Sequence, residues 1–381
     1  MRKYFLFLSL LFVLLPTLGA NAAEETVLIQ DQRTTVRAQV LEVTKEEEKL
    51  VPGTDTSSTY QDLQVTILDG EEIGKVVTVP NDFLSLTVGE KFYLVKTVRQ
   101  DGTEIYSVSE PYRLPALYFF TALFVASVII FGGKQGARGL LSLGGSFALI
   151  LFVLLPGILH GYSPITMSLG VAALIIILGS YITHGFNKTT SSAVIGMILT
   201  VLLSGGLAYA AVSTARLSGF DSDESVYLNL NTQGALDFQG LLLGGILIGR
   251  LGALYDAAIG QAIAVEELHA VGPHLPRTAI FKRALRIGRE HIGALVDTLA
   301  IAYVGASLPL LLLFYSAGDT NFSLILNREV FAVEVIRILI GSIGLVLAVP
   351  ITTIVSTLML IKSTSTADRA VVEQEEKALE E

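Results

Sequence analysis

Long apolar segments fill the chain from residue 114 onward, and they limit the folds open to it. A helix that crosses the hydrocarbon core of a bilayer needs about 20 mostly apolar residues. The seven segments of that kind are Leu114–Phe131, Gly139–Leu159, Ser163–Thr183, Ser191–Val212, Gly240–Ala264, Ile292–Phe314 and Val335–Leu360. Of all residues, 51% are hydrophobic and only 16% are charged, which is too apolar for a soluble domain. The predicted fold class is an α-helical polytopic membrane protein with about seven transmembrane helices.

The N-terminus predicts export of the segment that follows it. Two basic residues precede an apolar run, Tyr4–Leu18, and the small residues Ala20 and Ala22 then form a signal-peptidase site. We predict a signal peptide over residues 1–22, cleaved after Ala22. The alternative is an uncleaved anchor, although the apolar run of about 15 residues is shorter than a span of about 20. Both interpretations place the next segment outside the cell.

Residues 23–113 carry the alternating pattern of β-strands. The expected strands are Thr34–Val43, Gln61–Leu68, Lys75–Val79, Glu90–Val98 and Glu104–Val108, with a flexible loop at Thr54–Ser58. Turn signals separate them, and Asp101-Gly102 is a good hairpin turn. We predict a small extracytoplasmic β-barrel or OB-like domain. Because no stripe of aromatic and basic residues follows the strands, a structural or protein-contact role is favoured over binding of oligonucleotides or sugars.

Basic residues are concentrated in alternate connections between the apolar segments. The connections 132–138, 184–188 and 266–289 hold most of them, whereas the others show little beyond Arg216 and Arg328. The positive-inside rule places the basic connections in the cytoplasm, in agreement with the signal peptide. We therefore predict a multi-pass plasma-membrane protein with a transmembrane domain over residues 114–361 and a cytoplasmic tail over residues 362–381.

The inner connection 273–290 has a pattern of its own. Apolar residues recur there at helical spacing, namely Ile280, Phe281, Ala284, Leu285 and Ile287. Basic residues lie around the other face, namely Lys282, Arg283, Arg286 and Arg289. Two interpretations stay open: an amphipathic helix that lies on anionic lipid, or a basic loop that only sets the topology.

Charged residues inside two consecutive apolar segments are the best candidates for function. A charge in the hydrocarbon core costs roughly 2.5–3.5 kcal/mol on insertion scales, so Arg250, Asp256 and Asp297 need partners or water. At 1.5 Å per residue, Asp256 and Asp297 reach similar depths in neighbouring helices. Arg250 and Tyr303 are then expected together near the midplane. The intramembrane polar site is completed, at the entry of the sixth segment, by Glu290 and His291.

This constellation predicts a coupling-ion or proton site. Two neighbouring carboxylates raise the pKa of one of them, which lets a site load and release a proton near neutral pH. The alternative is structural: Arg250 neutralises a carboxylate and Asp297 bonds a neighbouring helix, so that both only fix the packing. An intramembrane aspartyl protease is disfavoured, because Gly293–Asp297 lacks the glycine two residues before the aspartate. We expect no enzyme and no catalytic residues.

Other chemistries are disfavoured by what the sequence lacks. The chain has no cysteine, which removes disulfides, thiolate ligands and cysteine nucleophiles. Acidic and histidine residues near the inner surface match no HExxH spacing, so no metal site is expected. No Walker loop, GxGxxG motif or serine elbow is present, and no cofactor is expected. The formal net charge of −9 argues against a nucleic-acid partner.

Several linked motifs resemble a known family. They are Gly240–Gly249, Leu251–Asp256, Ile287–Gly293, Ala302–Leu311 and Tyr181–Lys188, and together they are similar to the bacterial YibE/F-like membrane proteins. The resemblance covers most of the chain from about residue 35 onward. It implies an extracytoplasmic β-rich region followed by several spans in a bacterial cell membrane, without a reaction. In the family pattern a small residue is usual where this chain has Arg250, so the resemblance favours Asp256.

The sequence thus predicts a permease or ion-coupled transporter of unknown substrate. Asp256 is the principal carboxylate, Asp297 is its neighbour or proton partner, and Arg250 is a counter-ion or anion contact. The alternative is a non-transporting scaffold or sensor whose outer β-domain binds a partner or wall component. The expected partners are the lipid bilayer, a solute or ion, and a homo-oligomer.

Overall fold

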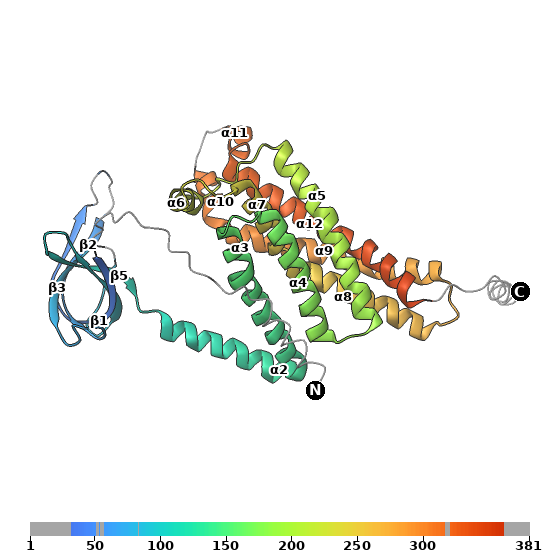
Figure 1. Ribbon diagram of the computed structural model, residues 1–381, viewed down its shortest axis with the longest axis horizontal. Helices are drawn as coiled ribbons and strands as arrows, with labels where there is room; N and C mark the ends of the chain where they lie inside the picture. The colour runs from blue at the N-terminus through green and yellow to red at the C-terminus, as the bar shows by residue number, and fades with distance from the viewer. Residues whose placement is uncertain (1–31, 51–52, 54–56, 83, 317–320, 362–381) are drawn as a thin grey trace, which may run out of the picture. The chain divides into compact units, whose positions relative to one another are not determined.

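The computed structural model describes residues 32–50, 53, 57–82, 84–316 and 321–361. The chain divides into two compact units, Met1–Leu123 and Phe124–Glu381. The predicted signal peptide, residues 1–22, and the predicted tail, residues 362–381, lie outside the described residues. Figure 1 labels strands β1, β2, β3 and β5 and helices α2 to α12.

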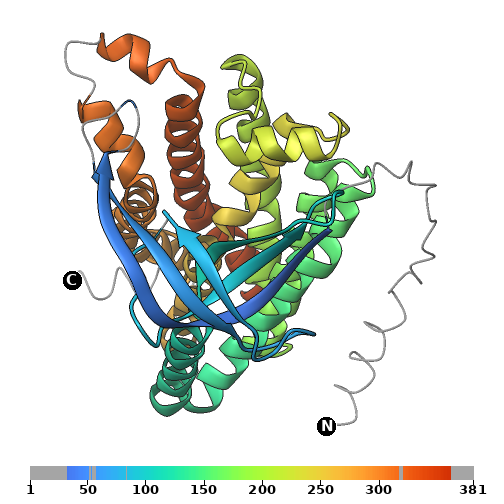
Figure 2. The same ribbon diagram turned by 90° about the vertical axis from the view of Figure 1, so that its left-hand side faces the viewer.

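The first unit is built on a five-stranded antiparallel sheet that curves into a half-barrel (Figure 2). Its strands are β1 (Gln32–Leu50), β2 (Ser57–Ile67), β3 (Val76–Asn81), β4 (Lys91–Val98) and β5 (Glu104–Pro111), in the order β3-β2-β1-β4-β5. All five predicted strands are therefore confirmed, and β1 is longer than predicted. Ser57 and Ser58 of the predicted loop belong to β2, whereas residues 54–56 lie outside the described residues.

Two irregularities in β1 help to curve the sheet. The part of β1 up to Gln39 pairs with β4, and the part from Ala38 onward pairs with β2. The β2 register shifts after Val40 and again after Val43. A bulge bends a strand and increases its twist, so one long strand serves both halves of the sheet. The apolar side chains of alternate positions, such as Leu63, are enclosed by the curve.

Charged side chains of β4 and β5 form a network with the turn before β3. The Lys96 Nζ atom lies 2.7 Å from Glu72 Oε1 and 2.6 Å from Glu104 Oε1. Lys75 Nζ lies 3.1 Å from Glu72 Oε1, and the Tyr106 hydroxyl donates to Glu72 Oε2 at 3.0 Å. Hydrogen bonds from Lys96 and Lys75 lower the pKa of Glu72 from 4.5 to about 2. The network ties the end of the sheet together through one carboxylate.

The remainder of the described chain is helical. By length and composition five helices can cross a membrane, or six if a bent pair counts as one span. They are Leu114–Leu159, Pro164–His184 (α4), Lys188–Thr214 (α5), Phe238–Val271, Glu329–Leu360 (α12) and the pair Arg277–Ala306 (α9) with Leu308–Ser316 (α10). The sequence predicted seven spans because it divided the first of these helices into two.

The first helical run is far longer than a bilayer is thick. It joins α2 (Leu114–Leu149), the π-helical turn η1 (Ile150–Leu154) and α3 (Leu155–Leu159), 46 residues in all. At 1.5 Å per residue such a run would extend about 69 Å, against a hydrocarbon core of about 30 Å. Gly133, with φ 52° and ψ −136°, breaks the helical geometry inside α2. The break falls where the sequence placed the connection between the first two spans.

Two later spans are also interrupted. Phe238–Val271 consists of α7 (Phe238–Gly249) and α8 (Leu251–Val271), which are separated only by Arg250. Only Ser307 separates the end of α9 from the start of α10, and the axes of the two helices are bent by 67°. Pro309 stands in the first turn of α10, where its missing N–H is tolerated. Both interruptions lie within apolar segments.

The predicted linker 273–290 is not a separate element, which corrects the sequence interpretation. From Arg277 onward it is the first part of α9 and runs without a break into the predicted sixth span. Its amphipathic pattern is confirmed, because Ile280 and Ala284 are fully buried while its basic residues are exposed. The apolar face packs on the protein, in a cluster that includes Ile361 at the end of α12.

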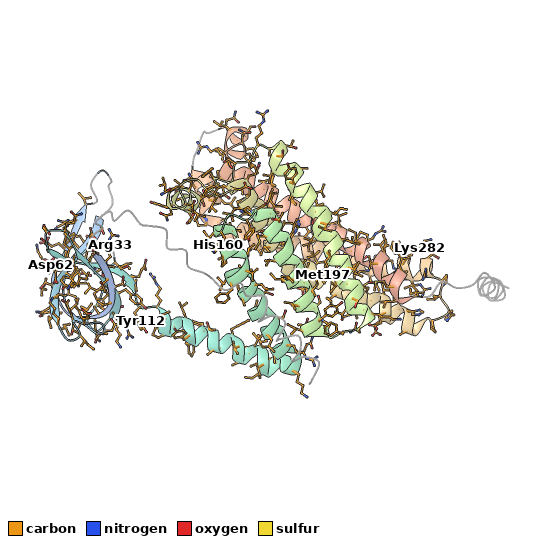
Figure 3. All side chains as sticks on the ribbon, viewed as in Figure 1. Arg33, Asp62, Tyr112, His160, Met197 and Lys282 are labelled. Carbon is orange, nitrogen blue, oxygen red and sulfur yellow. The ribbon has the colours of Figure 1, made fainter. Side chains whose placement is uncertain are left out.

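Helices α5 and α12 pack along an antiparallel seam of small and hydroxyl side chains. Three pairs define this seam: Ser192 with Ser356, Gly196 with Thr352, and Ser204 with Gly344. The first pair is joined by a hydrogen bond of 2.8 Å between the hydroxyl oxygens. In the second pair, a β-carbon on the glycine would stand 3.0 Å from Cα of the threonine. Small residues at every fourth position let the two backbones approach. Met197 of α5 is fully buried in the middle of this bundle (Figure 3).

Candidate functional site: a buried arginine at a helix interruption

Arg250 occupies the interruption between α7 and α8 and is only 1% exposed. It lies roughly 18 Å along the helix from Phe238, at 1.5 Å per residue, and so well inside the span. Within the described residues, none of its Nε, Nη1 and Nη2 atoms has a hydrogen-bond partner. A guanidinium carries five N–H donors and stays charged. A complete set of charged donors is therefore enclosed without acceptors.

Residues of three other helices surround the guanidinium. A β-carbon on Gly344 of α12 would stand 3.3 Å from Nη1 of Arg250 and 3.5 Å from Oγ of Ser204 on α5. A β-carbon on Gly249 would stand 2.9 Å from the hydroxyl of Tyr303 on α9. Tyr303 is also close enough to interact electrostatically with Arg250. Of the sequence-predicted site residues, the structure thus brings Arg250 and Tyr303 together.

A cavity of about 230 Å³ lies near one end of this cluster. Its lining includes Asp221, Gly245 of α7 and Arg337 of α12. The guanidinium of Arg337 is paired, at 2.5 Å from Glu334 Oε1 and 3.7 Å from Asp221 Oδ2. Tyr303 interacts electrostatically with Arg337 and Glu334 as well as with the buried Arg250. Of these two arginines, Arg337 has carboxylate partners and Arg250 has none within the described residues.

The two membrane aspartates are placed differently from the buried arginine. Asp256 on α8 and Asp297 on α9 are both exposed, and neither forms a hydrogen bond or ion pair within the described residues. Gln261 of α8 donates to the carbonyl of Ala284 on α9 at 2.7 Å. Counted from this contact the heights of the two aspartates differ by eight residues, roughly 12 Å, and counted from the contact of Gly249 with Tyr303 they differ by one residue, roughly 1.5 Å. They do not form one enclosed site.

Glu290 and His291 lie on the exposed side of α9. The His291 ring nitrogen Nδ1 is 3.1 Å from the carbonyl oxygen of Ile287, one turn earlier in the same helix. Glu290 forms no hydrogen bond or ion pair within the part of the chain that the structure describes. Neither side chain joins the cluster around Arg250.

Sequence reasoning missed a second polar group, between α4 and α8. The hydroxyl oxygens of Thr183 and Tyr255 are hydrogen-bonded, and His184 Nδ1 lies 3.1 Å from the Tyr255 hydroxyl. Tyr255 also donates to the carbonyl of Gly179 at 3.4 Å. Thr183 and His184 are adjacent in the sequence, but Tyr255 follows His184 only 71 residues later, so no local spacing links it to them. These hydroxyls have partners, unlike the guanidinium of Arg250.

Ser204 and Gly344 were missed as well, although the sequence carries a signal for them. Small or hydroxyl residues recur every fourth position on α5, at 192, 196, 200 and 204, and on α12, at 344, 348, 352 and 356. A four-residue repeat of small residues marks a helix face that can accept a close neighbour. The repeat ends near Arg250, because a β-carbon on Gly344 would lie close to both Arg250 Nη1 and the side chain of Ser204.

The comparison with known families covers the helical part of the chain. A family model described as YibE/F-like protein matches residues 120–362, which begin within α2 and include every helix after it. No curated protein and no solved structure matches the chain.

Proposed function

The chain belongs to the YibE/F-like family, and from that premise we propose that it is a permease or ion-coupled transporter of the cell membrane. The family description names no reaction, so the proposal rests on this chain's own geometry. Arg250, rather than Asp256, is the centre of the polar site. Asp256 and Asp297 remain outside it, on exposed helix faces.

The observation that carries the proposal is a fully buried, unpartnered guanidinium at an interruption within a span. Many secondary transporters bind their solute near the bilayer midplane, where helices are discontinuous. Here two neighbouring spans are interrupted, α7/α8 at Arg250 and α9/α10 at Ser307. A residue needed only for packing gains nothing from a buried charge, since an apolar side chain fills the same volume without desolvation. The charge points to a ligand.

The proposed orientation follows from charge. The exposed basic residues at the start of α9 support a cytoplasmic position for that end of the bundle, marked by Lys282 (Figure 3). The cavity beside Asp221 and Arg337 then opens to the outside. A solute would enter at this cavity and reach the guanidinium past Tyr303.

The absence of cysteine makes an accessibility test direct, because each introduced thiol is the only one. Ser204→Cys replaces a single oxygen by sulfur, close to Gly344 and therefore near Arg250. In right-side-out and inside-out vesicles, the thiol is expected to react with a membrane-impermeant methanethiosulfonate from both faces. A transporter must expose its central site to each side in turn, so labelling from both sides is the predicted result.

Leu203→Cys is the matched control, because Leu203 precedes Ser204 in the sequence and its side chain is 55% exposed on the outside of the helix bundle. In the membrane that position faces lipid, so an impermeant reagent should not reach it from either side. Labelling of Ser204→Cys from one face only, or from neither, would rule out transport through this site.

A scaffold or sensor is the second candidate, and one observation favours it. The half-barrel has an open hollow of about 410 Å³, lined in part by Lys91 and Tyr112. The Tyr112 ring meets that of Tyr93 edge to face at 5.7 Å, and Arg37 lies 5.6 Å from its centroid. Such a hollow suits a wall polysaccharide or a peptide. Binding of cell-wall material that is lost in Tyr112→Ala, with no labelling at position 204, would favour this function.

A further inference from the structure

We propose that Arg250 binds a small oxyanion, either a carboxylate or an inorganic oxyanion, and that the solute of the proposed permease is therefore an anion. The transport part of this inference rests on the proposed function. The binding part rests only on the surroundings of Arg250.

The charge balance around Arg250 favours an anion. Around Arg250 the side chains of Leu247, Leu251 and Leu254 belong to the buried apolar cluster. Tyr303 is the group that interacts electrostatically with it, and no carboxylate of the described residues does so. A cation in hydrocarbon surroundings needs a counter-charge or water. A cationic solute would be repelled and a neutral one would leave the charge uncompensated, so an anion is the class that fits.

The number and direction of the hydrogen-bond donors at Arg250 and Tyr303 also favour an oxyanion. A planar guanidinium presents paired N–H groups that match two oxygens of one carboxylate or oxyanion. The hydroxyl of Tyr303 has no hydrogen-bond partner within the described residues and can add a donor. The hydroxyl of Ser204 already donates to the carbonyl of Thr200 at 2.5 Å. Arg250 and Tyr303 are thus the donor pair that an oxyanion would meet.

The space around the guanidinium limits the size of the ligand. Two glycines surround the site, and a β-carbon would come within 3.3 Å of Arg250 Nη1 at position 344 and within 2.9 Å of the Tyr303 hydroxyl at position 249. Contacts this tight leave little free space beside the guanidinium, so a ligand there has to be small and the neighbouring side chains have to move to admit it. The fit favours a compact anion over a sugar phosphate or a nucleotide.

In this proposal the anion enters from the 230 Å³ cavity, whose lining includes Arg337 but neither Arg250 nor Tyr303. Arg337 holds Asp221 at 3.7 Å, a longer contact than its 2.5 Å pair with Glu334. An incoming oxyanion can replace the more distant carboxylate at Arg337 and then pass Tyr303 to the unpaired arginine. The anion would thus meet the paired guanidinium of Arg337 first and that of Arg250, which has no partner within the described residues, second, and the stronger attraction of the second would draw it inward.

The test is the thermal unfolding of the full-length protein in detergent, followed by circular dichroism at 222 nm because the chain has no tryptophan. Sodium acetate, sulfate or phosphate is titrated into a bulky sulfonate buffer at constant sodium concentration. A ligand that binds only the folded state stabilises it by RT ln(1 + [L]/Kd). We expect a saturable rise in Tm with at least one of these anions. Arg250→Met should remove the rise, and Arg250→Lys should keep a weaker one.

Arg283→Met is the matched control, because this exposed arginine lies on the basic face of α9. It should keep the full rise, which separates a site at Arg250 from general anion effects. Arg250→Met is expected to fold, since an apolar side chain of similar length removes an unpaired buried charge. No rise with any of the three anions, or a rise that persists in Arg250→Met, would overturn the inference.

The labelling experiment tests transport and the unfolding experiment tests anion binding, so either proposal can be contradicted without the other. A rise in Tm that depends on Arg250, with labelling of Ser204→Cys from one face only, would leave an anion-binding site in a protein that does not transport. Labelling from both faces without an anion effect would leave a transporter whose solute is not a small oxyanion. Labelling rates add a readout, because an anionic reagent should react faster than its cationic counterpart and Arg250→Met should remove that preference.

Discussion

The hydroxyl of Tyr303 lies against Gly249, at a place where a β-carbon would stand 2.9 Å from the oxygen. The two residues come from different spans, and the contact holds the tyrosine beside Arg250. Tyr303 can therefore occupy this position only because the last residue of α7, Gly249, has no side chain.

Gly249→Ala is expected to displace the Tyr303 ring and to destabilise the protein. Inserting a methyl into a filled site typically costs about 1–3 kcal/mol. In the Tyr303→Phe background the cost should be smaller, because the atom that the methyl meets is gone. The measurement is a double-mutant cycle of thermal unfolding in detergent.

Gly245→Ala is the control for this cycle, because it lies one turn earlier in α7 and has nothing within 4 Å of its β-carbon position. It should be neutral or stabilising by up to about 1 kcal/mol through helix propensity. Equal costs of Gly249→Ala with and without the tyrosine hydroxyl would show that the contact is absent.

The α5/α12 seam predicts a second pair of glycine substitutions. Gly196→Ala should destabilise strongly, because its β-carbon would meet Cα and Cβ of Thr352 at 3.0 Å and the Thr352 backbone cannot turn away. The expected loss is about 1–3 kcal/mol. Gly206→Ala, on the same helix with nothing within 4 Å, should not destabilise. Similar unfolding temperatures for the two variants would contradict the seam.

The placement of the membrane charges shows what a sequence can and cannot predict. Arg250 and Asp256 were expected in one polar site because they share a span. Six residues on a 3.6-residue helix turn by about 600°, so the two side chains point about 120° apart. Which face meets the protein depends on the packing of α5, α9 and α12, and the apolar pattern of a fully hydrophobic helix does not reveal it.

The structure predicts that Asp256 and Asp297 act independently. Both are exposed and neither has a polar partner within the described residues. The changes that Asp256→Asn and Asp297→Asn make in the free energy of unfolding should therefore add, within about 0.5 kcal/mol. The check is a double-mutant cycle at several pH values. A coupling energy that changes with pH would restore the shared proton site expected from the sequence.

Acid should loosen the charged network of the half-barrel. The pKa of Glu72 is lowered from 4.5 to about 2 by hydrogen bonds from Lys96 and Lys75. A carboxylate whose folded-state pKa is depressed contributes stability above its unfolded pKa, and this stability is lost as the pH falls from about 4.5 toward 2. Hydrogen exchange of β4 and β5 amides, corrected for intrinsic rates, should accelerate over that range.

Glu72→Gln should remove most of this pH dependence, because glutamine does not titrate. Glu71→Gln is the control, since Glu71 is exposed and forms no hydrogen bond or ion pair within the described residues. An equal effect of both substitutions on exchange would exclude Glu72 as the responsible group.

The strands of the half-barrel were predictable because their information is local. Alternating β-branched residues and turns such as Asp101-Gly102 mark each strand without reference to the rest of the chain. The interruption near Pro309 was signalled in the same way, by one residue that favours a helix start. The long β1, which serves two neighbours, was not predictable, because its bulges follow from the pairing itself.

The seam between α5 and α12 also bears on how the protein is made. The ribosome releases α5 into the bilayer long before α12 exists, so the hydroxyl groups of Ser192, Thr200 and Ser204 must spend that interval without their final neighbour. Each bonds a carbonyl of its own helix in the meantime. Translation of the last helix completes the core, and a chain interrupted before it would present a polar stripe to lipid and to the quality-control proteases that recognise one.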